Sequence, residues 1–230
     1  MKWGKSIWYF LAVTAAVACS TTRALSPDEF LLRKTSVKVD DNSFDAGSLN
    51  SYVVQKPNAY ILGVNPMLYV YNWAGDGDSG FQRFLRRIGT QPVVYNPAKV
   101  EESVNAMASH LHYMGYYGSK VESDIQVKGR QVYVAYYVTL GKRYTISAID
   151  YEIPTYGTFK QDFEADLPSS TLKAGDYLSE QTLEAEAERS AQFFRNRGYF
   201  GFTKSYYAFE ADTVGGISRS EERFSRNAET

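Results

Sequence analysis

The sequence is poor in residues on which common enzymes and metal-binding proteins depend. Its 230 residues include one cysteine, Cys19, and two histidines, His110 and His112. One cysteine excludes an internal disulfide, and histidines two positions apart on a helix point to different sides and cannot share a metal ion. Glycine-rich phosphate loops, the Gly-x-Ser-x-Gly elbow and the His-Glu-x-x-His motif are absent. We therefore expect a non-enzyme with no cofactor, no metal site and no small-molecule substrate.

An excess of charge of one sign is also missing, since the formal net charge is -1. A nucleic-acid partner would require a basic face, so none is expected. Asp76 and Asp78 have the spacing of a calcium ligand pair, but the rest of an EF-hand loop is missing. Glu184, Glu186 and Glu188 alternate and are expected on a solvated helix face rather than in a catalytic site. Aromatic residues make up 15% of the chain, which favours ordered, strand-containing structure.

The longest apolar run near the start, residues 7–18, is too short for a transmembrane helix, which needs about 20 residues. Lys2 and Lys5 precede it, and small residues come directly before Cys19, as in a secretory signal. This pattern resembles a bacterial lipobox, whose cysteine is alkylated by diacylglycerol. An ordinary signal peptide cut near Ala18 is the alternative. We expect a signal peptide over 1–18, a lipidated Cys19 and a tether over 19–33.

One stretch of the sequence occurs twice, without a gap and offset by 83 residues: 96–118 and 179–201. Each copy predicts an N-cap, at Asn96 and Ser179, and an apolar helical stripe. Each helix then meets a glycine, Gly115 or Gly198, placed to take the left-handed conformation that ends a helix. An aromatic residue follows each glycine. The repeat predicts two related α/β units.

The flanks of the two copies predict the remaining elements. We expect strands over 35–39, 120–128, 131–139, 144–153 and 204–211, and short helices over 46–54 and 158–165. Gly129-Arg130 suits a two-residue hairpin turn, and the run 131–139 is apolar on both faces, which predicts a central strand.

Domain boundaries follow from the same comparison of the two copies. Residues 58–93 have no counterpart in the second copy and form a predicted insertion in a first unit spanning 34–140. The insertion contains an amphipathic helix over 81–88, expected to pack on its own domain rather than on a membrane surface. The second unit spans 141–213 and lacks a last strand, because 214–230 is a polar tail without alternation.

The order strand, helix, helix, strand, strand after a secretory signal resembles the POTRA (polypeptide-transport-associated) domain. Gly115-Tyr116-Tyr117 and Gly198-Tyr199-Phe200 resemble the glycine-aromatic step that POTRA domains place before their hairpin. Three further motifs are similar to a lipoprotein branch of the BamA- and TamA-like outer-membrane assembly factors: Gln55-Lys56-Pro57-Asn58, Ile88-Gly89 with Pro92-Val93-Val94-Tyr95, and Arg195-Asn196-Arg197-Gly198-Tyr199.

The resemblance implies an α+β fold of tandem POTRA-like β-α-α-β-β units, the second incomplete. Each unit would be a three-stranded mixed sheet with two helices on one face. The family's C-terminal membrane β-barrel is not expected in this sequence, either because the reading frame is truncated or altered or because the sequence is a fragment.

The function expected from this resemblance is that of a lipid-anchored module of an outer-membrane protein assembly or translocation factor, on the periplasmic side of the outer membrane. Strand 120–128 would be a free sheet edge that binds extended chains by β-augmentation. The candidate site residues are Val121, Ser123, Ile125 and Val127, and the strand at 204–211 would be a second edge. The expected partners are unfolded outer-membrane proteins or assembly subunits. A lipid-anchored structural or adhesion protein without an assembly role is the alternative.

Overall fold

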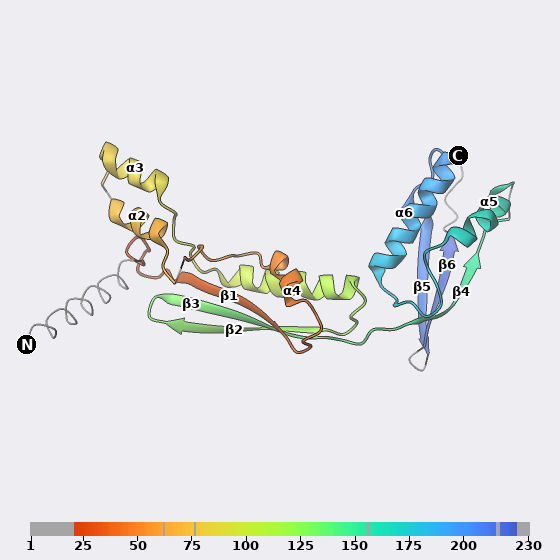
Figure 1. The fold of residues 1–230 in the computed structure, drawn as a ribbon, viewed down its shortest axis with the longest axis horizontal. Helices are drawn as coiled ribbons and strands as arrows, with labels where there is room; N and C mark the ends of the chain where they lie inside the picture. Colours follow the sequence, from red (N-terminus) through yellow and green to blue (C-terminus); the bar gives the residue numbers. More distant parts are fainter. Residues whose placement is uncertain (1–20, 62, 76, 156, 215–216, 225–230) are drawn as a thin grey trace, which may run out of the picture. The chain divides into compact units, whose positions relative to one another are not determined.

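The chain folds as two compact units, and each is described by itself (Figure 1). This computed structural model describes residues 21–61, 63–75, 77–155, 157–214 and 217–224. The first unit takes the residues up to Met107 and Val121–Thr139, and the second takes Ala108–Lys120 and the chain from Leu140 on. The division near residue 140 is close to the predicted boundary, but the end of the repeated helix and the loop after it belong to the second unit. Cys19 and the predicted signal peptide lie outside the described residues.

The first unit has a three-stranded mixed sheet. Its elements in chain order are β1 (Leu31–Val39), a 3₁₀ helix (Ala46–Tyr52), α2 (Pro66–Ala74), α3 (Gly80–Ile88), α4 (Pro97–Tyr113), β2 (Lys120–Lys128) and β3 (Gln131–Thr139). The strand order is β1-β3-β2, and β1 pairs with β3 in parallel. The α+β class and the central position of β3 are therefore confirmed.

Helix α4 covers one face of this sheet (Figure 1). Asn96 begins the helix as predicted, because its side-chain oxygen accepts the Ala98 N–H at 3.0 Å. The inward stripe of α4 is buried at Val100, Met107 and Leu111. On β3 every second side chain is buried, at Val132, Val134, Tyr136 and Val138. Each fully buried aliphatic side chain contributes about 1.5–3 kcal/mol, so this layer holds the first unit together.

The first residues that the structure describes make specific contacts, and the expectation of a tether over 19–33 is wrong for residues 21–33. The backbone N–H of Ala24 donates to Asn72 Oδ1 of α2 at 3.0 Å, and Leu25 is buried with Leu31 and Leu68. The guanidinium group of Arg130, in the β2–β3 turn, donates to the Leu25 carbonyl at 3.1 Å. Strand β1 also begins at Leu31, earlier than its β-branched run indicated.

Two side-chain amides hold together the two ends of the predicted insertion and the two segments that flank it. Asn58 Nδ2 donates to the Gln91 carbonyl at 2.8 Å, and Asn58 Oδ1 accepts the Val93 N–H at 3.0 Å. Gln55 makes the same kind of pair with Val94 and with the N–H of Asn96. The motifs around 55–58 and 92–95, far apart in sequence, therefore meet.

The second unit has its own sheet and core. Its elements are β4 (Ile146–Glu152), α5 (Phe159–Asp166), a 3₁₀ turn (Leu167–Ser169), α6 (Glu180–Asn196), a second 3₁₀ turn (Lys204–Tyr206), β5 (Tyr207–Val214) and β6 (Ile217–Phe224). Phe163, Ala187, Phe194 and Tyr207 form the buried core. Ser179 is the predicted N-cap of α6, since its hydroxyl accepts the Thr182 N–H at 3.1 Å.

Strand β6 corrects the prediction that the second unit is incomplete and that 214–230 is a polar tail. The strand order is β4-β6-β5, so β6 is central, parallel to β4 and antiparallel to β5. Strand pairing is made by backbone N–H and C=O groups, so a polar sequence without apolar alternation still pairs on both sides. Val214 pairs with Ile217, and the two glycines between them in the sequence are a hairpin signal that alternation alone does not detect.

A buried ion network corrects the expectation that Glu186 is solvated. Arg189 donates to Asp166 Oδ1 at 2.8 Å and to Glu186 Oε1 at 2.7 Å. Both carboxylates are buried, while Arg189 is about a quarter exposed, with 27% of its side chain accessible. Burial would raise the pKa of Glu186, but the hydrogen bonds from Arg189 and Thr171 outweigh it and lower the pKa below its ordinary value.

No helix within the described part of the chain is both long enough and apolar enough to cross a bilayer.

Candidate functional site

Strand β2 is an edge of the first unit's sheet, because among the described strands it neighbours only β3. One side of its backbone therefore has no strand partner in the described structure, as the sequence predicted. An antiparallel edge strand directs alternate N–H and C=O pairs to the open side, where an extended chain can bind them. This edge is the geometric basis of the candidate site.

All four predicted site residues lie on β2 and share one face of it, by the alternation of strand side chains. This face is on the same side of the sheet as the buried row of β3. At the outer edge it is less covered: Ile125 is 41% exposed and Val127 is 56% exposed. Val121 is half-buried and Ser123 is exposed. The edge therefore presents apolar side chains next to unpaired backbone.

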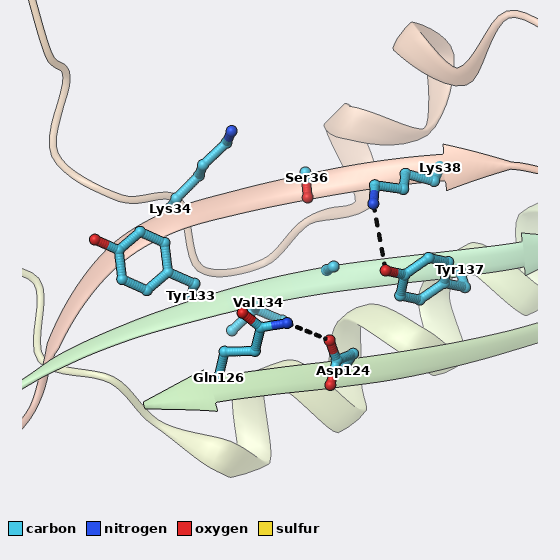
Figure 2. Close-up of a pocket in the computed structure, with 9 residues that line it drawn as sticks. Lys34, Ser36, Lys38, Asp124, Gln126, Tyr133, Val134 and Tyr137 are labelled. Atoms are coloured by element: carbon cyan, nitrogen blue, oxygen red, sulfur yellow. Dashed lines mark hydrogen bonds between the residues drawn. The ribbon is translucent and has the colours of Figure 1, made fainter. Parts of the chain in front are cut away.

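The opposite face of the sheet is polar and has a shallow hollow of about 240 Å³ (Figure 2). All three strands line it, with the following residues: Lys34, Ser36 and Lys38 of β1, Tyr133, Val134, Ala135 and Tyr137 of β3, and Asp124 and Gln126 of β2. The register explains this set, because Lys34, Ser36 and Lys38 pair with Tyr133, Ala135 and Tyr137.

The side chains on this face are held by cation–π contacts and hydrogen bonds. Lys38 Nζ lies 4.9 Å from the ring centre of Tyr137 and 3.3 Å from its hydroxyl (Figure 2). Lys128 Nζ lies 5.2 Å from the ring centre of Tyr133. Gln126 Nε2 donates to Asp124 Oδ2 at 3.1 Å. The face thus offers ammonium groups, phenols and a carboxylate in alternating positions.

The sequence predicted the edge strand, but it did not predict which side chains of β1 and β3 line the polar face of the same sheet. Lys34, Lys38 and Tyr137 were not among the predicted site residues. The alternation along 131–139 placed Tyr133 and Tyr137 on one face of that strand. The parallel register of β1 against β3 was the missing information, since it is fixed by contacts far apart in sequence.

The second predicted edge also exists. Strand β5 is at the edge of the β4-β6-β5 sheet, and it begins at Tyr207, three residues later than predicted because Lys204–Tyr206 forms a 3₁₀ turn. Tyr207 is buried, and Phe209 is partly buried against the same core. This edge therefore offers less apolar surface than β2 does.

The other residues singled out in the sequence do not form a site. His112 Nε2 lies 3.3 Å from Glu180 Oε1, and burial lowers the pKa of His110. Asp76 lies outside the described residues, and Asp78 is an exposed residue 4.0 Å from Arg83 Nε. Within the ranges that the structure describes, no three His, Cys, Asp or Glu side chains gather as a metal site.

A family model matches the chain at residues 76–141; it is POTRA, described as "Surface antigen variable number repeat". The match runs from just before α3 to just after β3 and includes the whole β2–β3 hairpin. The predicted resemblance to POTRA is thereby confirmed over these residues. No curated protein matches the chain.

Solved structures similar to the chain have low sequence identity. POTRA3-5 of Haemophilus influenzae BamA is 13% identical, with 84% of this chain and 61% of that chain covered and a TM-score of 0.39. POTRA1-2 of the periplasmic domain of Omp85 from Anabaena is 14% identical, with 87% and 98% covered and a TM-score of 0.33. CdiB from Escherichia coli is 11% identical, with 89% and 28% covered and a TM-score of 0.26. The chain thus spans about three fifths of the length of the BamA fragment.

Proposed function

We propose that this POTRA-containing chain binds extended segments of unfolded outer-membrane proteins or assembly subunits by adding them as a strand to the β2 edge. It would act at the periplasmic side of the outer membrane, held there by lipid on Cys19. The observation that supports the proposal is the unpartnered side of β2 beside an uncovered apolar row. Backbone bonds to such an edge do not depend on client sequence, which suits a receptor for many clients.

The two faces of β2 give this edge a preference for one kind of strand. A client strand beside β2 would place alternate side chains next to Ile125 and Val127 and the others next to Asp124 and Gln126. Strands of outer-membrane β-barrels alternate between apolar and polar side chains with the same period of two. The edge therefore matches the amphipathic pattern of these clients, while a uniformly polar chain would leave the apolar row uncovered.

The competing interpretation is an edge that is only solvated. Lys120, Glu122 and Lys128 place charges along β2, and charged side chains are a common protection of edge strands against aggregation. Ile125 and Val127 favour binding, since a purely protected edge gains nothing from exposing two aliphatic side chains. A structural or adhesion role without clients would leave this edge unoccupied in the cell.

A photocrosslinking experiment tests the proposal. A benzophenone side chain at Val127 should crosslink unfolded outer-membrane protein, while the same group at Val54, an exposed aliphatic position away from the edge, should not. Equal yields at the two positions, or none at Val127, would reject client binding at β2.

Two adjacent proline substitutions separate edge binding from folding. Alternate N–H groups of β2 point to β3 or to the open side, so Ile125→Pro and Gln126→Pro remove one of each. The variant that keeps the native melting temperature is the one that has lost an open-side donor, and it should crosslink several-fold less. Full crosslinking in that variant would contradict β-augmentation.

The anchor is tested independently of the edge. Labelled palmitate should be incorporated by cells that express the natural chain and not by the Cys19→Ser variant. Two acyl chains give stable membrane attachment, at about 0.8 kcal/mol for each buried CH₂ group. If both chains stay unlabelled while crosslinking at Val127 persists, the anchor proposal fails and the client proposal stands.

A further inference from the structure

The paired helices α2 and α3 present apolar side chains to solvent. Phe81, Phe84 and Ile88 form the exposed row of α3, with 63%, 55% and 47% of their surface accessible. Trp73, at the end of α2, is 75% exposed. The expectation that α3 packs its apolar face on its own domain is therefore wrong for three of the four residues in that face, since only Leu85 is buried. The exposed apolar row of α3 is therefore a candidate binding surface.

The pair is a formed structure, so its exposed face is not an accident of loose packing. Ser79 and Gln82 make a complete capping box at the start of α3. At its end, a Cβ on Gly89 would lie 2.6 Å from the backbone nitrogen of Tyr71, which shows how closely the two helices approach. The Thr90 N–H also donates to the Met67 carbonyl at 3.0 Å. The helices hold each other through these contacts and leave Phe81 and Phe84 outside.

The charged side chains on the two helices are all of one sign, and the acid Asp78 lies in the loop between them, 4.0 Å from Arg83 Nε. Helix α2 has no charged side chain, and α3 has three arginines, Arg83, Arg86 and Arg87, and no acid. Apolar and aromatic residues on one side of a helix and arginines on the other are typical of helices that lie in the interface of an anionic membrane. A second copy of the chain would bring arginines against arginines, with no acid on α2 or α3 to neutralise them, and Asp78 of the connecting loop already lies beside Arg83.

The N-terminal segment places this surface close to the proposed anchor. Ala24 is hydrogen-bonded to Asn72 of α2, and Arg23 lines a hollow together with Tyr69 and Trp73. The five residue-to-residue steps from Cys19 to Ala24 span at most about 18 Å when fully extended. Lipid on Cys19 would therefore keep α2 within that distance of the bilayer.

We propose that the α2–α3 pair is a membrane-docking surface, in which Trp73, Phe81, Phe84 and Ile88 enter the interface of an anionic phospholipid bilayer and the α3 arginines contact its headgroups. Its closeness to the bilayer in the cell rests on the proposed lipidation of Cys19. Binding of this surface to anionic lipid does not require the anchor, because an amphipathic cationic helix binds anionic lipid without acylation.

The processed chain offers an intrinsic probe of this contact. Of the three tryptophans, Trp3 and Trp8 lie in the predicted signal peptide, so Trp73 is the only one left after processing. The test uses the chain from residue 19 on, with Cys19→Ser, and vesicles of phosphatidylglycerol and phosphatidylethanolamine. The emission of Trp73 should shift to the blue and the chain should sediment with these vesicles. Neither should occur with phosphatidylcholine vesicles at the same salt concentration.

Matched variants identify the surface. Phe81→Ser with Phe84→Ser should weaken vesicle binding roughly tenfold or more, since two side chains lose their burial in lipid. Phe200→Ser, at a phenylalanine of the second unit that is 86% exposed, is the control and should bind normally. Arg83→Glu with Arg87→Glu should also weaken binding and reduce its dependence on salt.

Three results would overturn the proposal. They are unchanged vesicle binding in the Phe81 and Phe84 variant, equal binding to phosphatidylcholine vesicles, and a natural chain that dimerises through this face without binding vesicles. Palmitate labelling reports on the anchor separately, so failure of lipidation and failure of the docking surface give different results.

Discussion

At the scale of single residues, the repeated helix ends show how one glycine serves two purposes. Gly115 and Gly198 occupy equivalent positions of the repeat and both have positive φ, 86° and 99°. A Cβ at Gly198 would meet nothing within 4 Å, whereas one at Gly115 would lie 2.3 Å from the Leu178 carbonyl oxygen. The first copy therefore needs glycine for space as well as for conformation.

This difference predicts unequal costs for the same substitution. Gly198→Ala should lower the free energy of unfolding by about 1–2 kcal/mol, the cost of a left-handed non-glycine residue. Gly115→Ala should cost clearly more, because backbone of the second unit must also move. Urea denaturation followed by circular dichroism measures both, and equal losses would show that the contact with Leu178 is unimportant.

The buried ion network in the second unit depends on one cation, Arg189, which pairs with both carboxylates. Replacing Arg189 with Met removes the cation that neutralises Asp166 and Glu186, leaving two buried carboxylates without a positive charge beside them. We expect a loss of about 3–5 kcal/mol.

Lys160→Met is the matched control for that prediction. It breaks an exposed i,i+4 pair with Glu164 and should cost less than about 1 kcal/mol. Hydrogen exchange of the α6 amides measures both variants, and similar protection in the two would contradict a structural role for the network.

At the scale of elements, the sequence predicted helices and strands that have local signals, but it did not predict features that depend on contacts between distant segments. The sequence predicted α4, α6 and the β2–β3 hairpin, since caps, an apolar stripe and turn residues agree there. The site strand β2 was also predicted, because alternation is a local property. Strand β6 was not, because its pairing is made by the backbone, and the burial of Glu186 was not, because it depends on Arg189 and Asp166 together.

The central position of β6 predicts the effect of removing it. A stop codon in place of Gly215 deletes the strand that pairs with both β4 and β5, so neither of those strands keeps a neighbour in its sheet. Amide protection in β4 and β5 should be lost, while protection in β3 of the first unit should persist. Retained protection of β5 in the shortened chain would show that β6 is dispensable.

At the scale of the whole molecule, the two units differ in how they should respond to acid. Among carboxylates with a lowered pKa, Asp41 and Glu184 lie at the surface, and Glu186 is buried in the second unit. Because the pKa of Glu186 in the folded chain lies below the ordinary glutamate value of 4.5, its contribution to stability is present above pH 4.5 and is lost as the pH falls through the folded value.

We therefore expect acidification below about pH 4.5 to weaken the second unit before the first. Hydrogen exchange at a series of pH values, corrected for the intrinsic exchange rate, compares α6 with β3. Parallel weakening of the two units would mean that Glu186 does not dominate the response.

The position of the central strands in the chain sets the timing of folding. In both sheets the middle strand, β3 or β6, is the last strand of its unit to appear in the sequence. Because a chain is synthesised from its N-terminus, neither sheet can close until its final strand has left the ribosome. During synthesis the earlier strands lack their central partner, and in this interval the unfinished sheet is most exposed to aggregation and to chaperones.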